Sequence, residues 1–292
     1  MFLIGKSELV MEFYKTYAHR GKFCSGQYDH SNLEPYSALM EALRNFCNDL
    51  LFRDKVTIAN YKYRIIEAVG DEGILLTSAI NNLHLIIGQQ PSIAECLGRN
   101  AKNRFSYVLV KFIKAICSVG FPLILILEDL QWIDSSSCDI MTALIKDSAH
   151  LKNLILIGTY RENEVGNNHK LKSVLKLCEQ KGTKLTMINL KNLDEWVIND
   201  ILLDSLSCSS SFELFPLTAL LLKKTNGNPF YMNQVLQSYY EEGLIYFCSD
   251  TCRWKWNDEI FDEMNIAENI FEIIRNKMLT LDDPTLMTLK VA

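Results

Sequence analysis

Residues 119–134 read Val-Gly-Phe-Pro-Leu-Ile-Leu-Ile-Leu-Glu-Asp-Leu-Gln-Trp-Ile-Asp, and this stretch decides the fold. Five unbroken apolar residues, Leu123 to Leu127, follow Gly120 and Pro122 and end at two adjacent acids. A short apolar run bounded in this way predicts a strand buried on both faces of a parallel sheet. Its period also allows a buried helix, but the proline at its start and the acids at its end favour the strand.

The two acids, Glu128 and Asp129, come at the carboxyl end of this predicted strand. Open α/β sheets place their ligands at that end, and paired carboxylates there can hold Mg²⁺ and orient water. The alternative is a buried strand that ends in two solvated acids. A second apolar run, Leu154 to Thr159, ends in Tyr160 and Arg161. Tips of parallel strands converge, so Arg161 could contact a γ-phosphate there, or else form a surface salt bridge.

Length and composition indicate a soluble globular protein with one large domain or two ordinary ones. The chain has 292 residues, of which 48% are hydrophobic and 22% charged, with a net charge of −5. This charge does not indicate a nucleic-acid-binding surface. No apolar stretch approaches the roughly 18 residues of a membrane span, and Lys6, Ser7 and Glu8 interrupt the first ten residues. We therefore expect a cytoplasmic or nuclear protein without a signal peptide.

Nine cysteines are scattered along the chain without the spacing of a disulfide framework. Only Cys248 and Cys252 lie close together, on either side of a predicted turn at residues 249–251. A zinc site would need a second pair of ligands, which the sequence does not offer at a suitable spacing. Reduced cysteines are the expected state.

The first residues contain Gly5-Lys6-Ser7, which are the last three residues of the phosphate-binding pattern Gly-x4-Gly-Lys-[Ser/Thr]. In that pattern backbone amides surround phosphates, the lysine neutralises them and the hydroxyl binds Mg²⁺. The first glycine of the pattern would fall one position before Met1. The tripeptide also arises by chance, in which case Ser7 simply begins an amphipathic helix that runs to about Arg20.

The intervening elements alternate in the manner of an α/β protein. We expect a short strand at 22–25 and a further apolar strand at 185–190, beside the two already described. Helices are expected at 36–51, over most of 54–90, at 100–118, 135–150 and 171–178. Asp134 is better explained as the N-cap of the 135–150 helix than as a catalytic residue.

Beyond Asn192 helical spacing replaces strand signals, which predicts a second, helical part from about Asp194. A turn at residues 225–230 precedes a helix at 231–242, and the segments 244–247 and 253–256 read as a hairpin before a helix at 266–281. Helix, hairpin and helix resemble a winged-helix element, which would suggest DNA binding. Residues 226–292 nevertheless contain eleven acids against five Lys or Arg, so a packing or regulatory role is favoured.

Several of these segments together resemble a known family. The chain resembles the AAA ATPase domain that is named for its similarity to origin-recognition ATPases, within the STAND class of P-loop signalling ATPases, in the version found in large multidomain sensor kinases. The resemblance spans nearly the whole chain in the family's order and rests on these segments: Ile4-Gly5-Lys6-Ser7-Glu8-Leu9-Val10, Gly26-Gln27-Tyr28-Asp29, Ile86-Ile87-Gly88-Gln89-Gln90-Pro91, Asn103-Arg104-Phe105, Leu127-Glu128-Asp129-Leu130-Gln131-Trp132-Ile133-Asp134, Ile157-Gly158-Thr159-Tyr160-Arg161-Glu162-Asn163-Glu164-Val165 and Gly227-Asn228-Pro229-Phe230.

The resemblance implies a role for each matching residue, with ATP and Mg²⁺ as cofactors. Gly5, Lys6 and Ser7 would end the phosphate loop, with Lys6 on the β- and γ-phosphates and Ser7 on Mg²⁺. Glu128 and Asp129 would be the Walker B acids, one holding Mg²⁺ and the other orienting water, with the division between them open. Arg161 would sense the γ-phosphate, and Pro229 would lie near the adenine and couple the helical part to the nucleotide.

The implied fold is a three-layer P-loop NTPase sheet followed by helical and winged-helix-like parts. We expect a core at 1–192, a helical subdomain at 193–240 and a partial winged-helix-like element at 241–292. The family's phosphate loop has an earlier glycine and a preceding central strand, which would lie between the strands ending at Arg161 and Leu190. Here Met1 falls inside the loop, so we expect a core that lacks its first strand, and a chain truncated at both ends.

Two functions follow from the resemblance. The first is an ATP-hydrolysing switch that couples nucleotide state to domain rearrangement and acts on other domains or proteins of a signalling assembly, without DNA and without a membrane span. The second is a nucleotide-free remnant that keeps the fold as a protein-interaction scaffold. An origin-type, DNA-binding ATPase is disfavoured by the acidic residues beyond Asn226.

Overall fold

The structure is a computed structural model that describes residues 4–31, 34–92, 98–207 and 211–257. It divides into two compact units. Unit 1 comprises residues 7–188, and unit 2 begins at Asn189 and also includes the residues just before Ser7. The expected helix at 266–281 lies outside the described residues. None of the helices in the described ranges has the length and apolar character needed to cross a membrane.

Unit 1 is built on a parallel sheet with the strand order β1-β2-β3, comprising β1 (Lys22–Gln27), β2 (Leu123–Glu128) and β3 (Leu154–Gly158). The central strand β2 pairs with both neighbours, and Leu123 to Leu127 are all buried. A strand with covered faces and two neighbours must be apolar at every position, which explains the unbroken run in the sequence. The expected α/β fold with a parallel sheet is confirmed.

One face of the sheet carries the main core. Helix α2 (Ser37–Leu51) packs on β1 and β2, and further helices cover it: α3 (Lys55–Val69), α4 (Gly73–Ala79), α5 (Leu83–Ile87), α6 (Gly98–Cys117), α7 (Ser135–Lys146) and α8 (Lys170–Gln180). The approach of α2 to the sheet requires a glycine, because a Cβ on Gly26 would lie 1.9 Å from the carbonyl oxygen of Ala38. The large core on this face fixes the strand tips.

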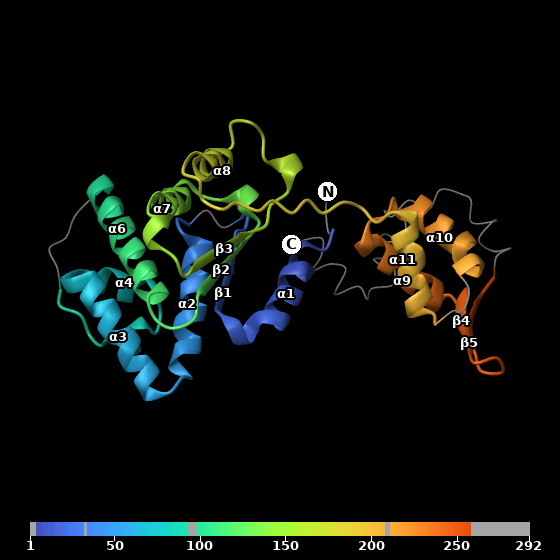
Figure 1. Ribbon diagram of the computed structural model, residues 1–292, viewed down its shortest axis with the longest axis horizontal. Helices are drawn as coiled ribbons and strands as arrows, with labels where there is room; N and C mark the ends of the chain where they lie inside the picture. The colour runs from blue at the N-terminus through green and yellow to red at the C-terminus, as the bar shows by residue number, and fades with distance from the viewer. Residues whose placement is uncertain (1–3, 32–33, 93–97, 208–210, 258–292) are drawn as a thin grey trace, which may run out of the picture. The chain divides into compact units, whose positions relative to one another are not determined.

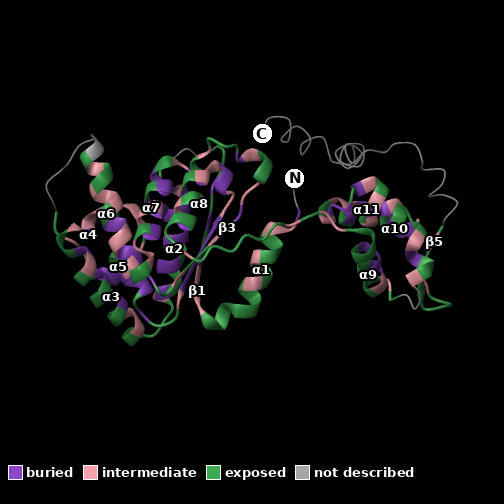
Figure 2. Ribbon diagram, turned by 45° about the horizontal axis from the view of Figure 1, so that its top comes forward, coloured by how far each residue is buried: buried purple, intermediate pink, exposed green. Residues whose placement is uncertain are grey.

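Helix α1 (Lys6–Tyr17) lies on the other side of the sheet from α2 (Figure 1). Its rings of Phe13 and Tyr14 contact Phe23 of β1 at centroid distances of 5.8 and 5.1 Å. No residue of α1 is buried, and Figure 2 accordingly shows this helix without purple. Contact between α1 and the sheet therefore depends on a few aromatic side chains and on one polar contact at the head of the helix.

The expected strand at 185–190 is wrong. The structure has no strand or helix at 183–194, and Met187 and Ile188 are 57% and 70% exposed. The apolar pattern predicts side chains that suit a strand, but a strand also needs a neighbour to satisfy its backbone N–H and C=O groups. In the described part of the chain, β3 is an edge of the sheet and no strand pairs with residues 185–190.

Unit 2 contains α9 (Glu195–Ser205), α10 (Ser211–Thr225), α11 (Pro229–Glu241) and an antiparallel hairpin of β4 (Ile245–Cys248) and β5 (Arg253–Trp256). It has its own apolar core, formed by Ile198, Leu202, Leu214, Leu217, Leu221, Met232, Val235, Tyr239 and Ile245. The helical character of this region and the hairpin were both expected from the sequence, and both are confirmed.

Candidate functional site

The candidate site begins at the head of α1. Gly5 has φ +89°, a left-handed conformation that favours glycine, and Lys6 is the first residue of the helix. One residue later, the Ser7 hydroxyl donates a hydrogen bond of 2.5 Å to Oε2 of Glu128, which is the last residue of β2. The structure thus brings together two of the residues singled out from the sequence, although they lie 121 positions apart.

Asp129 follows Glu128 and turns sharply away from the strand. Its φ of +56° is left-handed, a conformation that Asp adopts more readily than most side chains. One carboxylate oxygen accepts from Gln27 Nε2 at 2.7 Å and the other accepts from Gln131 Nε2 at 2.9 Å. Two amides from different elements therefore fix the direction in which the carboxylate points.

The carboxyl end of β3 is hydrogen-bonded to the turn at Asp129. Thr159 N–H donates to Leu127 O at 3.0 Å, Leu130 N–H donates to Thr159 O at 2.8 Å, and the Thr159 hydroxyl accepts from Asp129 N–H at 3.3 Å. Gly158 leaves room for this turn, since a Cβ there would lie 2.3 Å from a methyl carbon of Leu130. The acids consequently lie on a rigid junction of two strand ends.

Arg161 lies just beyond this junction, before the short helical turn η5 (Glu162–Glu164). Its Nη1 forms an ion pair of 2.9 Å with Glu164 Oε1, and its guanidinium lies 5.1 Å from the ring centroid of Trp132. Its backbone N–H donates to Gln131 Oε1 at 3.1 Å. These contacts hold the arginine beside the segment that follows the acids, and its expected role as a γ-phosphate sensor stays a prediction.

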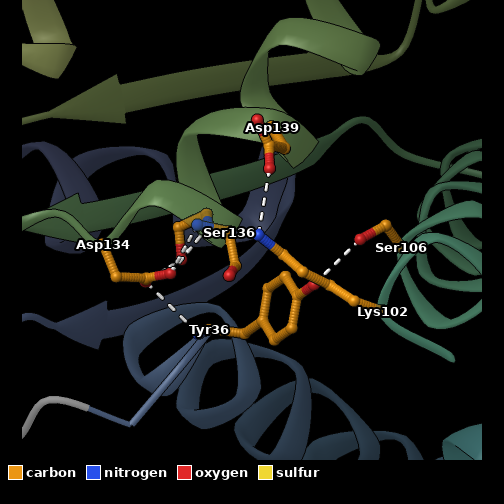
Figure 3. A network of polar contacts seen from close by, with 7 residues as sticks. Tyr36, Lys102, Ser106, Asp134, Ser136 and Asp139 are labelled. Carbon is orange, nitrogen blue, oxygen red and sulfur yellow. Dashed lines mark hydrogen bonds and ion pairs between the residues drawn. The ribbon is translucent and has the colours of Figure 1, made fainter. Parts of the chain in front are cut away.

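Asp134 acts as the cap that the sequence indicated. Its Oδ1 accepts from the N–H groups of Ser136 and Ser137 at 2.8 and 3.0 Å, at the start of α7. Its Oδ2 accepts from Tyr36 N–H at 3.2 Å, and the Tyr36 hydroxyl lies 2.8 Å from Ser106 Oγ on α6 (Figure 3). The residue thus ties α2 to α7 and holds the far end of the loop that begins at Asp129.

Pro229 lies in unit 2, where it is the first residue of α11, and Asn228 caps that helix. The preceding Gly227 has φ +71°, and a Cβ there would lie 2.0 Å from the carbonyl oxygen of Leu193. Leu193 N–H donates back to Gly227 O at 2.7 Å. This explains physically why a glycine stands at this turn, while the expected role of Pro229 near adenine stays a prediction.

Three residues of the site were given no role from the sequence: Gln27, Gln131 and Thr159. A signal for Gln27 was available, because it ends β1 and is the register partner of Glu128. Polar residues at adjacent carboxyl ends of parallel strands meet at one edge. No comparable signal existed for Gln131, whose amide reaches Asp129 only because of the left-handed turn between them.

The fold and the site define an α/β protein of the P-loop NTPase-like type. The family described as AAA ATPase domain matches residues 4–157, more than half of the chain, and the chain belongs to this family. The chain is also similar to hybrid signal transduction histidine kinase G of Dictyostelium discoideum, with 24% identity over 351 residues. The match covers 99% of this chain and 10% of that relative, so the chain spans about a tenth of its length. No solved structure matches the chain.

The family implies a bound nucleotide with a metal ion, and the residues at the junction fit a magnesium ion. Mg²⁺ prefers hard oxygen donors and is commonly held by one or two carboxylates together with phosphate oxygens and water. The Ser7 hydroxyl and the Glu128 carboxylate are two such donors already in contact. Within the described ranges no group of three or more His, Cys, Asp or Glu side chains is arranged so that it could hold a metal ion.

Proposed function

We propose that the chain is an ATP-binding and ATP-hydrolysing switch module of a signalling protein, in which the nucleotide state is coupled to rearrangement of domains. The observation that carries the proposal is the contact between Ser7 Oγ and Glu128 Oε2. It joins a hydroxyl at a helix head to a carboxylate at a strand tip, which is the pairing a phosphate-bound Mg²⁺ requires. Membership of the AAA family supports ATP as the nucleotide, and the kinase relative supports signalling.

The geometry also supports a division of work between the two acids. Glu128 holds the metal together with Ser7, because these two side chains share one point. Asp129 orients the attacking water, because its carboxylate is held in one direction by Gln27 and Gln131 while retaining lone pairs for a further donor. The bound Mg²⁺ supplies neutralisation of the developing phosphate charge. Gly5 and Lys6 contribute the amide and the cation of the phosphate loop.

The finer classification and boundaries belong to the same proposal. The module is of the STAND, origin-recognition-like subclass, with a core at 1–192, a helical subdomain at 193–240 and a partial winged-helix-like element at 241–292. Pro229 transmits nucleotide state to the helical subdomain, and Arg161 senses the γ-phosphate. The acidic balance beyond Asn226 supports partners other than DNA.

A thermal-shift measurement with Mg²⁺-ATP tests nucleotide binding. A ligand at one hundred times its Kd stabilises the folded state by about 2.7 kcal/mol, so the parent chain should melt several degrees higher with Mg²⁺-ATP. The substitutions Lys6→Ala and Ser7→Ala should remove most of this shift. Thr16→Ala, which deletes an exposed hydroxyl at the far end of the same helix, should retain it.

Steady-state measurements of phosphate release then distinguish the roles of Glu128 and Asp129. Asp129→Asn should keep the Mg²⁺-ATP thermal shift and lose at least 100-fold in hydrolysis, whereas Glu128→Gln should weaken the magnesium dependence of binding itself. Equal loss of binding in both variants would contradict the division of roles.

The second candidate is a nucleotide-free scaffold of the same fold, and exposed apolar side chains favour it. Ile155 and Leu156 of the edge strand are exposed, and so are Met187 and Ile188 in the segment after α8. Exposed apolar side chains often mark surfaces that bind other polypeptides. Under this candidate no concentration of Mg²⁺-ATP shifts the melting temperature of the parent chain. The thermal-shift experiment therefore decides between the two.

A further inference from the structure

Gln131 is a buried glutamine in the middle of the candidate site. It lies on the short helical turn η3 (Leu130–Trp132), which directly follows Asp129, and it is only 5% exposed. A buried side-chain amide must use its donor and its acceptor inside the protein, because a buried polar group without a partner is costly. The partners of this amide therefore indicate which parts of the site it holds together.

The two ends of the Gln131 amide contact two different residues of the site. Its Nε2 donates to Asp129 Oδ1 at 2.9 Å, and its Oε1 accepts from the backbone N–H of Arg161 at 3.1 Å. A carboxylate accepts and a backbone N–H donates, so this orientation of the amide satisfies both partners. Because the donor and the acceptor belong to one planar group, the Asp129 carboxylate and the main chain of Arg161 are held at a fixed separation.

The main chain of Gln131 is also held in place. Its carbonyl oxygen lies 2.9 Å from Nε2 of His169, and Nδ1 of the same ring accepts from Leu171 N–H at the start of α8. Since Nδ1 accepts, the neutral ring carries its proton on Nε2 and donates it to the Gln131 carbonyl oxygen. With its main chain held from α8, the Gln131 side chain has little freedom to follow one of its partners without the other.

Arg161 contacts the same turn through its side chain as well. Its guanidinium lies 5.1 Å from the ring centroid of Trp132, the residue after Gln131. At the end of β3, the Thr159 hydroxyl accepts from Asp129 N–H at 3.3 Å. The segment from Thr159 to Arg161 thus contacts the turn at several points. Of the contacts named here, the one through Gln131 ends on the Asp129 carboxylate.

We propose that Gln131 is a positioning residue that makes ATP hydrolysis depend on the position of Arg161. The inference rests on the proposed function, in which Asp129 orients the attacking water and Arg161 contacts the γ-phosphate. Water attacks the γ-phosphorus, the bond to the ADP oxygen breaks, and ADP, inorganic phosphate and one proton are released. A γ-phosphate that fixes Arg161 also fixes its main chain, and the Gln131 amide passes that position to the Asp129 carboxylate. Once the phosphate has left, this constraint on Asp129 is released.

Steady-state hydrolysis of Mg²⁺-ATP by the whole chain tests the proposal. Gln131→Met keeps the length of the side chain and removes both hydrogen bonds. We expect kcat to fall on the order of tenfold or more, with the KM for ATP unchanged within about twofold, because a positioned group is lost and nucleotide contacts are kept. Gln180→Met, which changes an exposed glutamine at the end of α8, is the control and should leave both constants unchanged. An unchanged kcat in Gln131→Met would overturn the inference.

Gln131→Glu separates the two halves of the contact. The introduced carboxylate can still accept from Arg161 N–H, but it has no donor for the Asp129 carboxylate and repels it. Protonation of the introduced carboxyl restores a donor. The kcat of Gln131→Glu, relative to that of Gln131→Met, should therefore rise several-fold as the pH is lowered from about 8 to about 6. A merely structural role for Gln131 predicts no such recovery, and a ratio that does not change with pH would contradict the proposal.

A double-variant cycle tests the coupling itself. Arg161→Ala removes the guanidinium and keeps the backbone N–H, so it should lower kcat through loss of the γ-phosphate contact. If Gln131 transmits the position of Arg161, combining Arg161→Ala with Gln131→Met should cost much less than the product of the two single losses. Losses that multiply would overturn the inference. Failure of the proposed function looks different, since the parent chain would then show neither a thermal shift with Mg²⁺-ATP nor phosphate release.

Discussion

Gly26 lies where the backbone of β1 meets α2, and it shows how one missing side chain sets the distance between a sheet and a helix. We expect Gly26→Ala to destabilise the protein by about 3 kcal/mol or more, because its Cβ would lie 1.9 Å from the Ala38 carbonyl oxygen and backbone cannot easily move aside. Urea denaturation followed by circular dichroism measures this. Gly166→Ala, which meets nothing within 4 Å, is the control and should change stability by less than about 0.5 kcal/mol.

Asp134 provides a second test, because its four hydrogen bonds are structural rather than catalytic; the fourth is donated to Oδ2 by the Ser137 hydroxyl. Asp134→Ala should cost about 2 kcal/mol or more, since the cap of α7 and the link to Tyr36 are lost together. Asp139 on the same helix forms a surface ion pair with Lys102 at 3.3 Å (Figure 3), and Asp139→Ala should cost no more than about 1 kcal/mol. Equal unfolding midpoints for the two variants would contradict the assigned role of Asp134.

The exposed edge strand β3 should influence how readily the protein aggregates. Ile155 and Ile124 are register partners on the same face of the sheet, but Ile155 is 44% exposed and Ile124 only 3%. Ile155→Lys should lower aggregation in a centrifugation or light-scattering assay with little change in stability, because charged side chains discourage edge-to-edge strand pairing. Ile124→Lys buries a charge and should prevent stable folding. Faster aggregation of Ile155→Lys than of the parent chain would contradict this account of the edge.

The elements that could be predicted from the sequence are those whose own residue types reveal how they are buried or capped. The apolar run of β2 indicated a strand with both faces covered, and the capping residues Asp134 and Asp194 marked the starts of two helices. The error at 185–190 is of another kind, because a strand exists only through its neighbour. Likewise, the pairing of Ser7 with Glu128 was expected from the resemblance, whereas the Gln27 and Gln131 contacts with Asp129 depend on a turn that the residue pattern did not reveal.

The buried thiols should lower the free energy of unfolding of the whole protein in alkali. The unfolded chain ionises its cysteines from about pH 9, while burial holds the pKa of Cys24 and Cys47 at about 12 and of Cys117 and Cys138 at about 11. Above pH 9 the unfolded state therefore binds fewer protons, and its free energy falls relative to the folded state by up to about 1.4 kcal/mol per pH unit for each such cysteine. Below pH 9 these four groups contribute no pH dependence.

Lys22 acts in the opposite direction over part of this range. Burial lowers its pKa from 10.5 to about 8, so between those values the unfolded state binds more protons and stability gains as the pH rises. The gain in stability from Lys22 cancels the loss from about one of the four cysteines. The free energy of unfolding should therefore still fall between pH 9 and 10.5. Urea midpoints at pH 8 and pH 10 check this. Cys24→Ala should show a smaller fall than the parent, and an equal fall would contradict the explanation.

The contact between Leu193 and Gly227 has a mechanical consequence. The chain enters unit 2 at residue 189, and Leu193 is fastened to the turn before α11 by a hydrogen bond of 2.7 Å and by a backbone approach that only glycine permits. Tension on residues 189–192 therefore acts first on the contact between Leu193 and Gly227, before it reaches α9. A larger residue at position 227 would collide with the Leu193 carbonyl oxygen, so such a substitution would detach Leu193 from the turn before α11.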